Sequence, residues 1–255
     1  MTKLISLCSF CLFTVILCAQ GPWGGRWANP RFEAAGGASR TPVTGAPYSA
    51  TRTTQIQRVL SDGNQVSRTE QSKVYRDTQG RTRSQRTITP PASSGKQPYT
   101  VATIVDPVGG YRYRLNSSNM TAIQRALPAQ SASTTGSTPP TRPSQPNGVQ
   151  VSTVNLGTQT INSVPATGTQ VTRTIPAGAI GNAQPITIVG TTWISTDLKV
   201  PVQIKSNDPR RGSIDMELTN IQESAPDPSL FTVPSTYTIK TAGSGAGPRA
   251  NRLHR

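Results

Sequence analysis

Short stretches in which apolar and polar residues alternate recur along this chain, and turn sequences separate them about every 8 to 12 residues. The clearest stretch runs from Ser213 to Ile221, where Ile214, Met216 and Leu218 fall on one face and the residues between them on the other. Asp62-Gly63-Asn64 is one of the intervening tight-turn sequences. The pattern predicts a mainly β fold, a curved antiparallel sheet or half-barrel with at most one or two short helices.

The individual elements follow from the same alternation. We expect strands at 51–60, 65–75, 81–88, 99–105, 111–115, 149–156, 158–164, 169–175, 186–195, 200–205 and 213–221. The strands at 158–164 and 169–175 are expected to form a hairpin across Pro165 to Gly168. Ser118 to Leu127 is expected to form a short helix, because Met120, Ile123 and Leu127 are spaced for one helical face.

The N-terminus is typical of a secretory signal peptide. Lys3 precedes an apolar run from Leu4 to Leu17, and Cys18 and Ala19 follow. The run is shorter than the roughly 20 apolar residues that span a bilayer, so an uncleaved anchor is the weaker alternative. A lipoprotein signal is disfavoured because the residue before Cys18 is a leucine rather than a small residue. We therefore expect an exported protein, periplasmic or extracellular, with no transmembrane span after cleavage.

Composition divides the chain into one domain and several segments without a fold. Residues 1–19 are the expected signal peptide, and residues 20–47, rich in Gly, Ala, Pro and Arg, are expected to be a disordered linker. A single β-rich domain is expected at 48–240, interrupted by a Pro/Ser/Thr-rich low-complexity loop at 128–148. Residues 241–255 are expected to be a disordered basic tail.

Several classes of chemistry are excluded by the residues that the chain lacks. The three cysteines, Cys8, Cys11 and Cys18, all lie in the expected signal peptide, so the mature chain has no thiol or disulfide. His254 is the single histidine and lies next to the C-terminus. A catalytic triad needs a positioned base and a zinc site needs Cys or His ligands, so neither is expected. We expect no catalytic, cofactor-binding or metal-binding residues.

A hydrolase that uses only carboxylates is the one enzymatic reading left. Asp215 and Glu217 lie on the same face of a predicted strand. A solvated strand face that pairs with neighbouring basic side chains explains them equally well, and we favour it. The chain is therefore not expected to be an enzyme.

Basic residues dominate the charge of the chain, whose formal net charge is +15. Because the chain is expected to be exported, nucleic acid is not an expected partner, and the available polyanions are anionic lipids and cell-envelope polymers. Six arginines on neighbouring predicted strands form a potential cationic strip: Arg76, Arg81, Arg83, Arg86, Arg112 and Arg114. A solvated sheet face is the alternative, and we favour it.

Three aromatic residues each have two possible locations. Tyr111 and Tyr113 share one face of a predicted strand, and Trp193 lies in a long apolar strand. Each either belongs to the core or lines a groove. The candidate contacts for a ligand or polyanion are therefore Arg76, Arg81, Arg83, Arg112, Arg114, Tyr111, Tyr113 and Trp193.

Several short motifs resemble a family of uncharacterised exported bacterial proteins. They are Tyr75 to Arg83 (YRDTQGRTR), Ile104 to Gly110 (IVDPVGG), Thr174 to Asn182 (TIPAGAIGN), Trp193 to Leu198 (WISTDL), Asp208 to Gly212 (DPRRG), Leu218 to Ile221 (LTNI) and Pro226 to Pro234 (PDPSLFTVP). The pattern is also similar to LolA-like and RseB-like periplasmic proteins. That resemblance implies a half-barrel around one or two helices, with an apolar cavity for acyl chains.

Two functions from different classes remain. The first is a non-enzymatic binding module for a lipid, lipoprotein or other amphiphile. The second is a surface-adhesive or structural protein that binds anionic cell-envelope polymers through a cationic sheet face, in which case salt should weaken the binding.

Overall fold

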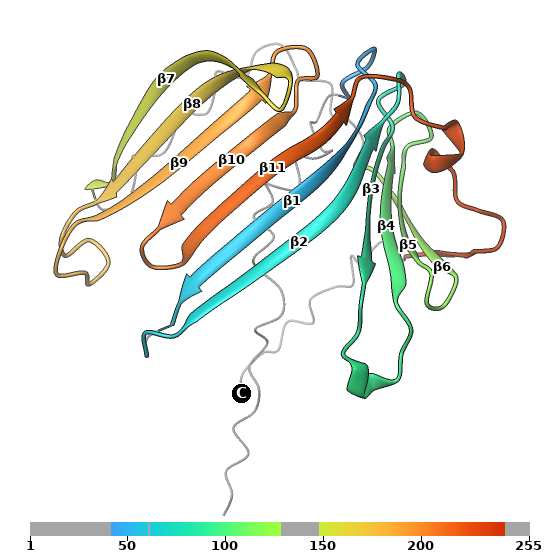
Figure 1. Cartoon of the computed structure of the whole chain (residues 1–255), viewed down its shortest axis with the longest axis horizontal. Helices are drawn as coiled ribbons and strands as arrows, with labels where there is room; N and C mark the ends of the chain where they lie inside the picture. The colour runs from blue at the N-terminus through green and yellow to red at the C-terminus, as the bar shows by residue number, and fades with distance from the viewer. Residues whose placement is uncertain (1–41, 61, 129–147, 243–255) are drawn as a thin grey trace, which may run out of the picture.

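The chain folds into one open, curved sheet of twelve strands (Figure 1). The computed structural model describes residues 42–60, 62–128 and 148–242. In chain order the strands are β1 (Tyr48–Val59), β2 (Gln65–Arg76), β3 (Thr82–Ile88), β4 (Tyr99–Asp106), β5 (Tyr111–Asn116), β6 (Thr121–Ala126), β7 (Gln150–Ile161), β8 (Val164–Ile175), β9 (Ile186–Ser195), β10 (Pro201–Asp208), β11 (Gly212–Gln222) and β12 (Thr238–Thr241). Two single-turn 3₁₀ helices, η1 (Ala92–Ser94) and η3 (Pro228–Phe231), accompany them. The predicted mainly β fold is confirmed.

The strand order is β12-β6-β5-β4-β3-β2-β1-β11-β10-β9-β8-β7. Neighbouring strands pair antiparallel except β12, which lies parallel to β6 at one edge. The sheet bends between its two halves, so that β3 to β6 stand at a steep angle to β7 to β11 (Figure 1). The segment after β11 returns along the outer side of β4 to β6, and β12 completes that edge. Within residues 42–60, 62–128 and 148–242, one half of the sheet is therefore covered on its outer side and open on its inner side.

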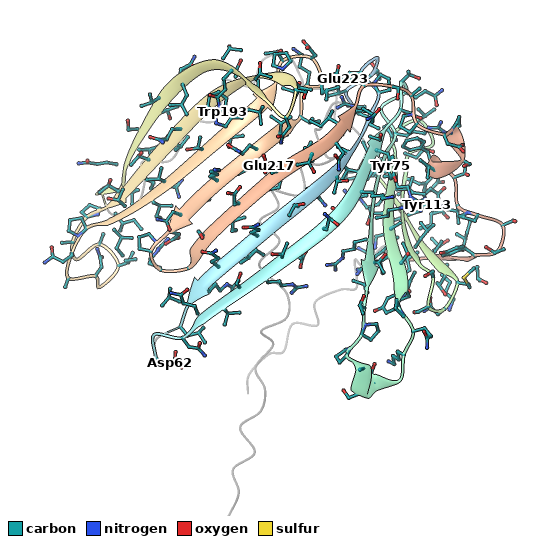
Figure 2. All side chains as sticks on the ribbon, viewed as in Figure 1. Asp62, Tyr75, Tyr113, Trp193, Glu217 and Glu223 are labelled. Atoms are coloured by element: carbon teal, nitrogen blue, oxygen red, sulfur yellow. The ribbon has the colours of Figure 1, made fainter. Side chains whose placement is uncertain are left out.

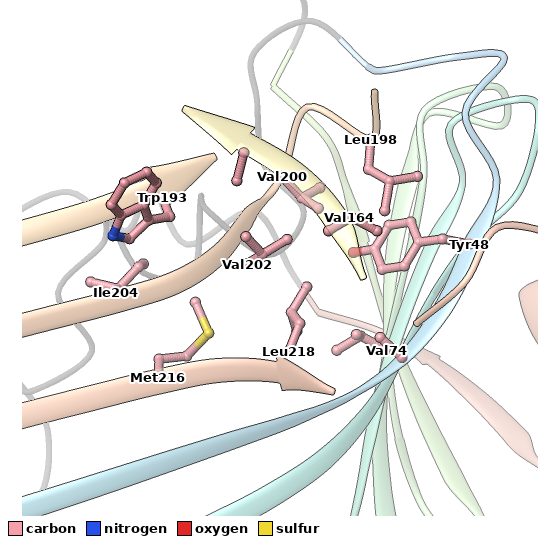
Figure 3. Packing of buried hydrophobic residues seen from close by; sticks show 12 residues of the cluster. Tyr48, Val74, Val164, Trp193, Leu198, Val200, Val202, Ile204, Met216 and Leu218 are labelled. Carbon is pink, nitrogen blue, oxygen red and sulfur yellow. The ribbon is translucent and has the colours of Figure 1, made fainter. Parts of the chain in front are cut away.

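The larger apolar core lies at one end of β1, β2 and β8 to β11 (Figure 3). Its buried residues are Tyr48, Ala50, Val74, Val164, Ala166, Trp193, Leu198, Val200, Val202, Ile204, Met216 and Leu218. Val200, Val202 and Ile204 alternate into this core, with exposed fractions of 7%, 0% and 7%. Leu198 and Val200 come from the loop between β9 and β10, which folds back onto the core.

Trp193 packs against a glycine on the neighbouring strand. A Cβ on Gly168 would lie 2.6 Å from the Trp193 ring, so only glycine leaves room for the indole. Asn162, at the tip of the β7–β8 hairpin, donates to the Leu218 carbonyl at 2.6 Å and to Glu217 at 2.9 Å. The tip thus reaches β11 past two intervening strands, which requires the sheet to coil strongly at this end.

The smaller core lies between β4 to β6 and the segment that follows β11. Ala102, Ile104, Leu115 and Ala122 are buried there, and Tyr113, Val233 and Tyr237 pack against them. We call residues 223–237 the C-terminal segment. Because the C-terminal segment covers these four side chains, β4 to β6 each bury one face. Among the described residues the other face stays open, as in a half-buried antiparallel sheet.

The predicted helix at Ser118 to Leu127 is wrong, because Thr121–Ala126 form strand β6. Ala122 is fully buried under the C-terminal segment, whereas Ile123 is 41% exposed on the opposite face. The inward residue is therefore a small alanine and the large apolar residue points outward. Because the larger apolar residue points away from the core, the segment lacks the usual strand alternation, and the spacing of its apolar residues resembled that of a helix.

The predicted turn at Pro165 to Gly168 is also wrong. The hairpin instead turns at Asn162 and Ser163, whose φ values are +47° and +72°, and the two predicted strands at 149–156 and 158–164 are one bulged strand, β7. Two consecutive residues with positive φ are characteristic of the primed turns of tight hairpins. Asparagine adopts this conformation readily, but serine does so less often.

Four predicted segments lie outside the described residues, apart from a few terminal positions. They are the signal peptide, the linker at 20–47, the low-complexity loop at 128–148 and the tail at 241–255. His254 lies outside the described residues as well. Those assignments remain predictions.

Candidate ligand-binding face

The open side of β3 to β6 and β12 carries a row of basic residues. Residues that pair directly across antiparallel strands share a face, and three such rows cross this half of the sheet. The rows are Thr82–Val105–Arg112–Arg125, Ser84–Thr103–Arg114–Ile123–Lys240 and Arg86–Val101–Asn116–Thr121–Thr238. We call this surface the cationic face. It lies opposite the C-terminal segment, on the inner side of the bend (Figure 1).

None of the positions in these rows is an aspartate or a glutamate. Arg86 reaches Glu70 on β2 at 3.3 Å, in a pair that is more than a third exposed and therefore weak. Within the part of the chain that the structure describes, Arg112, Arg114, Arg125 and Lys240 form no ion pair. The cationic face therefore carries positive charge that the described residues leave uncompensated.

Apolar side chains lie between these basic residues. Val101 and Val105 are half-buried on β4, and Ile123 is 41% exposed between Arg114 and Lys240 in its row. Apolar surface beside guanidinium groups lowers the local dielectric constant and strengthens their attraction for an anion. The face thus offers basic groups for an anionic head group and apolar surface for an acyl chain.

Arg112 and Arg125 lie directly opposite each other on β5 and β6. Like charges in this position destabilise a sheet. The Nε of Arg112 is also buried and has no hydrogen-bond partner among the described residues. An unsatisfied buried donor costs about 1–3 kcal/mol, so the pair is unfavourable in two respects in the free protein.

Arg76, one of the predicted ligand contacts, is buried and bonds to backbone carbonyls of other segments. It is 3% exposed, and its guanidinium donates to the Ala46 carbonyl at 2.9 and 2.7 Å and to the Leu198 carbonyl at 2.5 Å. It also lies 5.0 Å from the centre of the Tyr48 ring. Burial lowers the pKa of Arg76 and raises the pKa of Tyr48. Arg76 therefore ties the chain before β1 and the β9–β10 loop to the end of β2.

Arg81 and Arg83 hold the C-terminal segment. Arg81 bonds to Asp77 at 2.6 Å and lies 5.4 Å from the centre of the Phe231 ring. Arg83 donates to the Leu230 carbonyl at 2.8 Å, and burial lowers its pKa. The six arginines predicted as one strip are thus divided between the core end, the covered face and the cationic face.

The three predicted aromatic contacts lie away from the cationic face. Figure 2 shows Tyr113 and Trp193 in different halves of the sheet. Tyr113 packs on the smaller core beneath the C-terminal segment, and its hydroxyl accepts a hydrogen bond from Gln124 at 3.3 Å. Tyr111, 39% exposed, has its ring centre 6.2 Å from that of Tyr113. Trp193 is 8% exposed in the larger core, in the other half of the sheet. Of the eight predicted contacts, only Arg112 and Arg114 lie on the cationic face.

A shallow hollow of about 310 Å³ lies on the opposite side of the sheet, over β1 and β9 to β11. Amide and hydroxyl groups dominate its lining, which includes Gln55, Gln57 and Thr191, and Lys205 pairs with Asp215 there at 3.7 Å. It does not have the apolar lining that an acyl-chain cavity requires. Asp215 is thus engaged with a lysine, and Glu217 accepts from Asn162, as expected for a solvated strand face.

Two features are absent from residues 42–60, 62–128 and 148–242. No helix there is long and apolar enough to cross a bilayer. No cluster of three or more His, Cys, Asp or Glu side chains there is suited to holding a metal ion.

Sequence reasoning missed two members of the cationic face. Arg125 was assigned to a helix, so its position opposite Arg112 was not apparent. Lys240 reaches the face only because β12 pairs in parallel with β6, a contact between residues far apart in the chain. A signal for Arg125 was present, since Thr121, Ile123 and Arg125 alternate with Ala122, Gln124 and Ala126.

Several solved structures align with this chain at low sequence identity and low TM-score. No family model and no curated protein matches the sequence. Among solved structures, a chain of the Pseudomonas aeruginosa MucA/MucB complex aligns with a TM-score of 0.40 and 11% identity, over 84% of this chain and 62% of that one. A LolA superfamily protein from Nitrosomonas europaea aligns with a TM-score of 0.33 and 11% identity, over 73% of this chain and 90% of that one. LprF from Mycobacterium bovis aligns with a TM-score of 0.31 and 14% identity, over 76% of this chain and 91% of that one.

These values describe a likeness of fold alone. This chain spans about three fifths of the length of the MucA/MucB chain that it matches.

Proposed function

We propose that this protein is a non-enzymatic binding module of the cell envelope whose ligand is an anionic amphiphile. The observation that carries the proposal is the cationic face, where Arg112, Arg114, Arg125 and Lys240 have no acidic partner among the described residues and lie beside Val101, Val105 and Ile123. An anionic head group compensates the basic side chains, and an acyl chain covers the apolar ones.

The ligand lies on an open sheet face in this proposal and not in a closed cavity. The hollow on the other side of the sheet is shallow and lined mainly by amide, hydroxyl and charged residues, and the large buried apolar side chains pack against one another in the core. Binding on an open face buries only part of an acyl chain, so the charged contacts must supply a large share of the affinity. This favours anionic over zwitterionic amphiphiles with the same chain.

The alternative is adhesion to anionic envelope polymers through the same cationic face. Salt weakens both kinds of binding, so salt alone does not separate them. The half-buried valines favour the amphiphile, because a soluble polyanion gains nothing from apolar surface. A polymer without acyl chains that binds as tightly as the amphiphile would favour the adhesive function.

Isothermal titration of the chain from Gln20 onward tests the proposal. The two probes are myristoyl lysophosphatidylglycerol and myristoyl lysophosphatidylcholine, each below its micelle-forming concentration. The protein is expected to bind the anionic probe at least about tenfold more tightly, a difference of about 1.4 kcal/mol. Equal affinity for the two probes would contradict the proposal.

Two double variants with the same loss of charge locate the site. Arg114→Gln with Lys240→Gln is expected to weaken binding of the anionic probe about tenfold, because both cations lie on the cationic face. The control is Lys73→Gln with Arg173→Gln, two exposed residues outside that face. The control is expected to change the affinity less than twofold, and equal losses in both variants would mean that net charge alone drives binding.

A further inference from the structure

The arginine pair on β5 and β6 has more specific chemistry than the rest of the cationic face. Arg112 and Arg125 are direct cross-strand partners, and Val105 and Thr82 continue the same row. Arg114 and Ile123 pair in the next row along the same two strands. Two guanidinium groups held side by side present several N–H donors in a fixed arrangement, with a third close by.

The free protein leaves this arrangement incomplete. The Nε of Arg112 is buried, cannot reach water and has no acceptor within the part of the chain that the structure describes. Asp106, the acid nearest along the chain, belongs to the row of Tyr111 and Ala126 on the opposite face, and it accepts hydrogen bonds from the backbone of Val108 and Gly109. No acidic side chain of the described residues therefore compensates the pair.

From these observations we infer that Arg112 and Arg125 form a clamp for a phosphate-type oxoanion. A tetrahedral oxoanion has acceptors in several directions, so it can accept from the buried Nε of Arg112 and from the exposed guanidinium of Arg125 together. Its charge also converts the repulsion between the two arginines into attraction to a common partner. The inference rests on the proposed function, for which the clamp is the head-group subsite.

The oxoanion has two possible sources, a phospholipid head group and free phosphate. Titrations with inorganic phosphate and with dihexanoyl phosphatidic acid, a soluble short-chain lipid, separate them. The readout is the ¹H–¹⁵N signal of the Arg112 Nε–H group together with the midpoint of thermal unfolding, at constant ionic strength set with chloride. Phosphatidic acid is expected to shift the signal and raise the midpoint. If inorganic phosphate binds with the same affinity as dihexanoyl phosphatidic acid, the site also accepts free phosphate.

Arg125→Gln is the decisive variant, because Arg125 is exposed and its replacement leaves the fold intact. The affinity for the anion is expected to fall at least about tenfold. At low salt and without the anion, the thermal midpoint of the variant is expected to lie above that of the wild type, since one of the two facing charges is gone. Arg173→Gln, an exposed arginine on β8, is the control and is expected to change neither quantity.

Two results would overturn the clamp: no shift of the Arg112 signal with either anion, or equal affinity of the wild type and Arg125→Gln. These failures are distinct from failure of the proposed function. If Arg125→Gln still binds lysophosphatidylglycerol like the wild type, the clamp is wrong and the binding face stands. If phosphate binds at the clamp but lysophosphatidylglycerol does not bind the wild type, the clamp stands and the amphiphile proposal falls.

Discussion

Replacing Arg76 with alanine is expected to lower the free energy of unfolding by about 3–5 kcal/mol. The guanidinium is buried and donates to the carbonyls of Ala46 and Leu198, so its removal leaves one partly buried and one buried acceptor without this partner, each costing up to about 1–3 kcal/mol. The cavity left beside Tyr48 adds to the loss. Urea unfolding followed by circular dichroism measures the change.

Two further variants separate the hydrogen bonds of Arg76 from its volume. Arg76→Met keeps an unbranched apolar stem but has no donors, and it is expected to lose about 2–3 kcal/mol. Arg173→Ala, at an exposed position, is expected to stay within about 0.5 kcal/mol of the wild type. If Arg76→Met were as stable as the wild type, the two carbonyl bonds would contribute nothing, as occurs for some buried charged groups.

The second large effect is expected at Phe231, where η3 packs onto the sheet. Phe231 is 3% exposed and lies under the Arg81 guanidinium, whose position Asp77 fixes. Phe231→Ala is expected to cost about 3–5 kcal/mol, the usual range for a buried phenylalanine. Urea unfolding again gives the value.

A matched control for Phe231 lies in the same turn. The side chain of Ser229 is exposed, and its backbone N–H and its hydroxyl both bond to the exposed Asp227 carboxylate. Ser229→Ala is therefore expected to change stability by less than about 0.5 kcal/mol. A similarly small effect of Phe231→Ala would mean that the C-terminal segment does not stabilise β3 to β6.

These two sites explain why arginines with similar sequence contexts have different roles. Arg81 lies just before β3, Arg83 lies on β3 and Arg112 lies on β5, all near apolar residues. Their roles depend on which face the C-terminal segment covers, and that contact joins residues about 150 positions apart, as in the bond from Arg83 to Leu230. Local alternation assigns a side chain to one of two faces but does not say which face another segment will cover.

The sheet itself was predictable wherever one face of a strand is buried. β10 and β11 alternate cleanly because Val202, Ile204, Met216 and Leu218 pack in the core while their neighbours face water. The ends of β7 were predicted inaccurately because eleven of its twelve residues are exposed. Burial therefore imposes no alternation of apolar and polar residues on this strand. β6 was missed because the side chain that it buries is the small Ala122.

The candidate site was predictable in part for the same reason. The alternation in β5 correctly separated Arg112 and Arg114 from Tyr111, Tyr113 and Leu115. The facing arginine on β6 became apparent only when that segment proved to be a strand. The unfavourable pair from which we infer the clamp is thus a property of cross-strand register, which single-strand patterns do not contain.

Amide hydrogen exchange of the wild-type protein, with and without myristoyl lysophosphatidylglycerol, tests the central claim most directly. Ligand on the cationic face is expected to slow exchange in β3 to β6, at residues 82–126, and to leave β7 to β9 unchanged. The zwitterionic lysophosphatidylcholine is expected to give little protection at the same concentration. Protection confined to β7 to β11, or equal protection by the two lipids, would contradict binding of an anionic amphiphile at the cationic face.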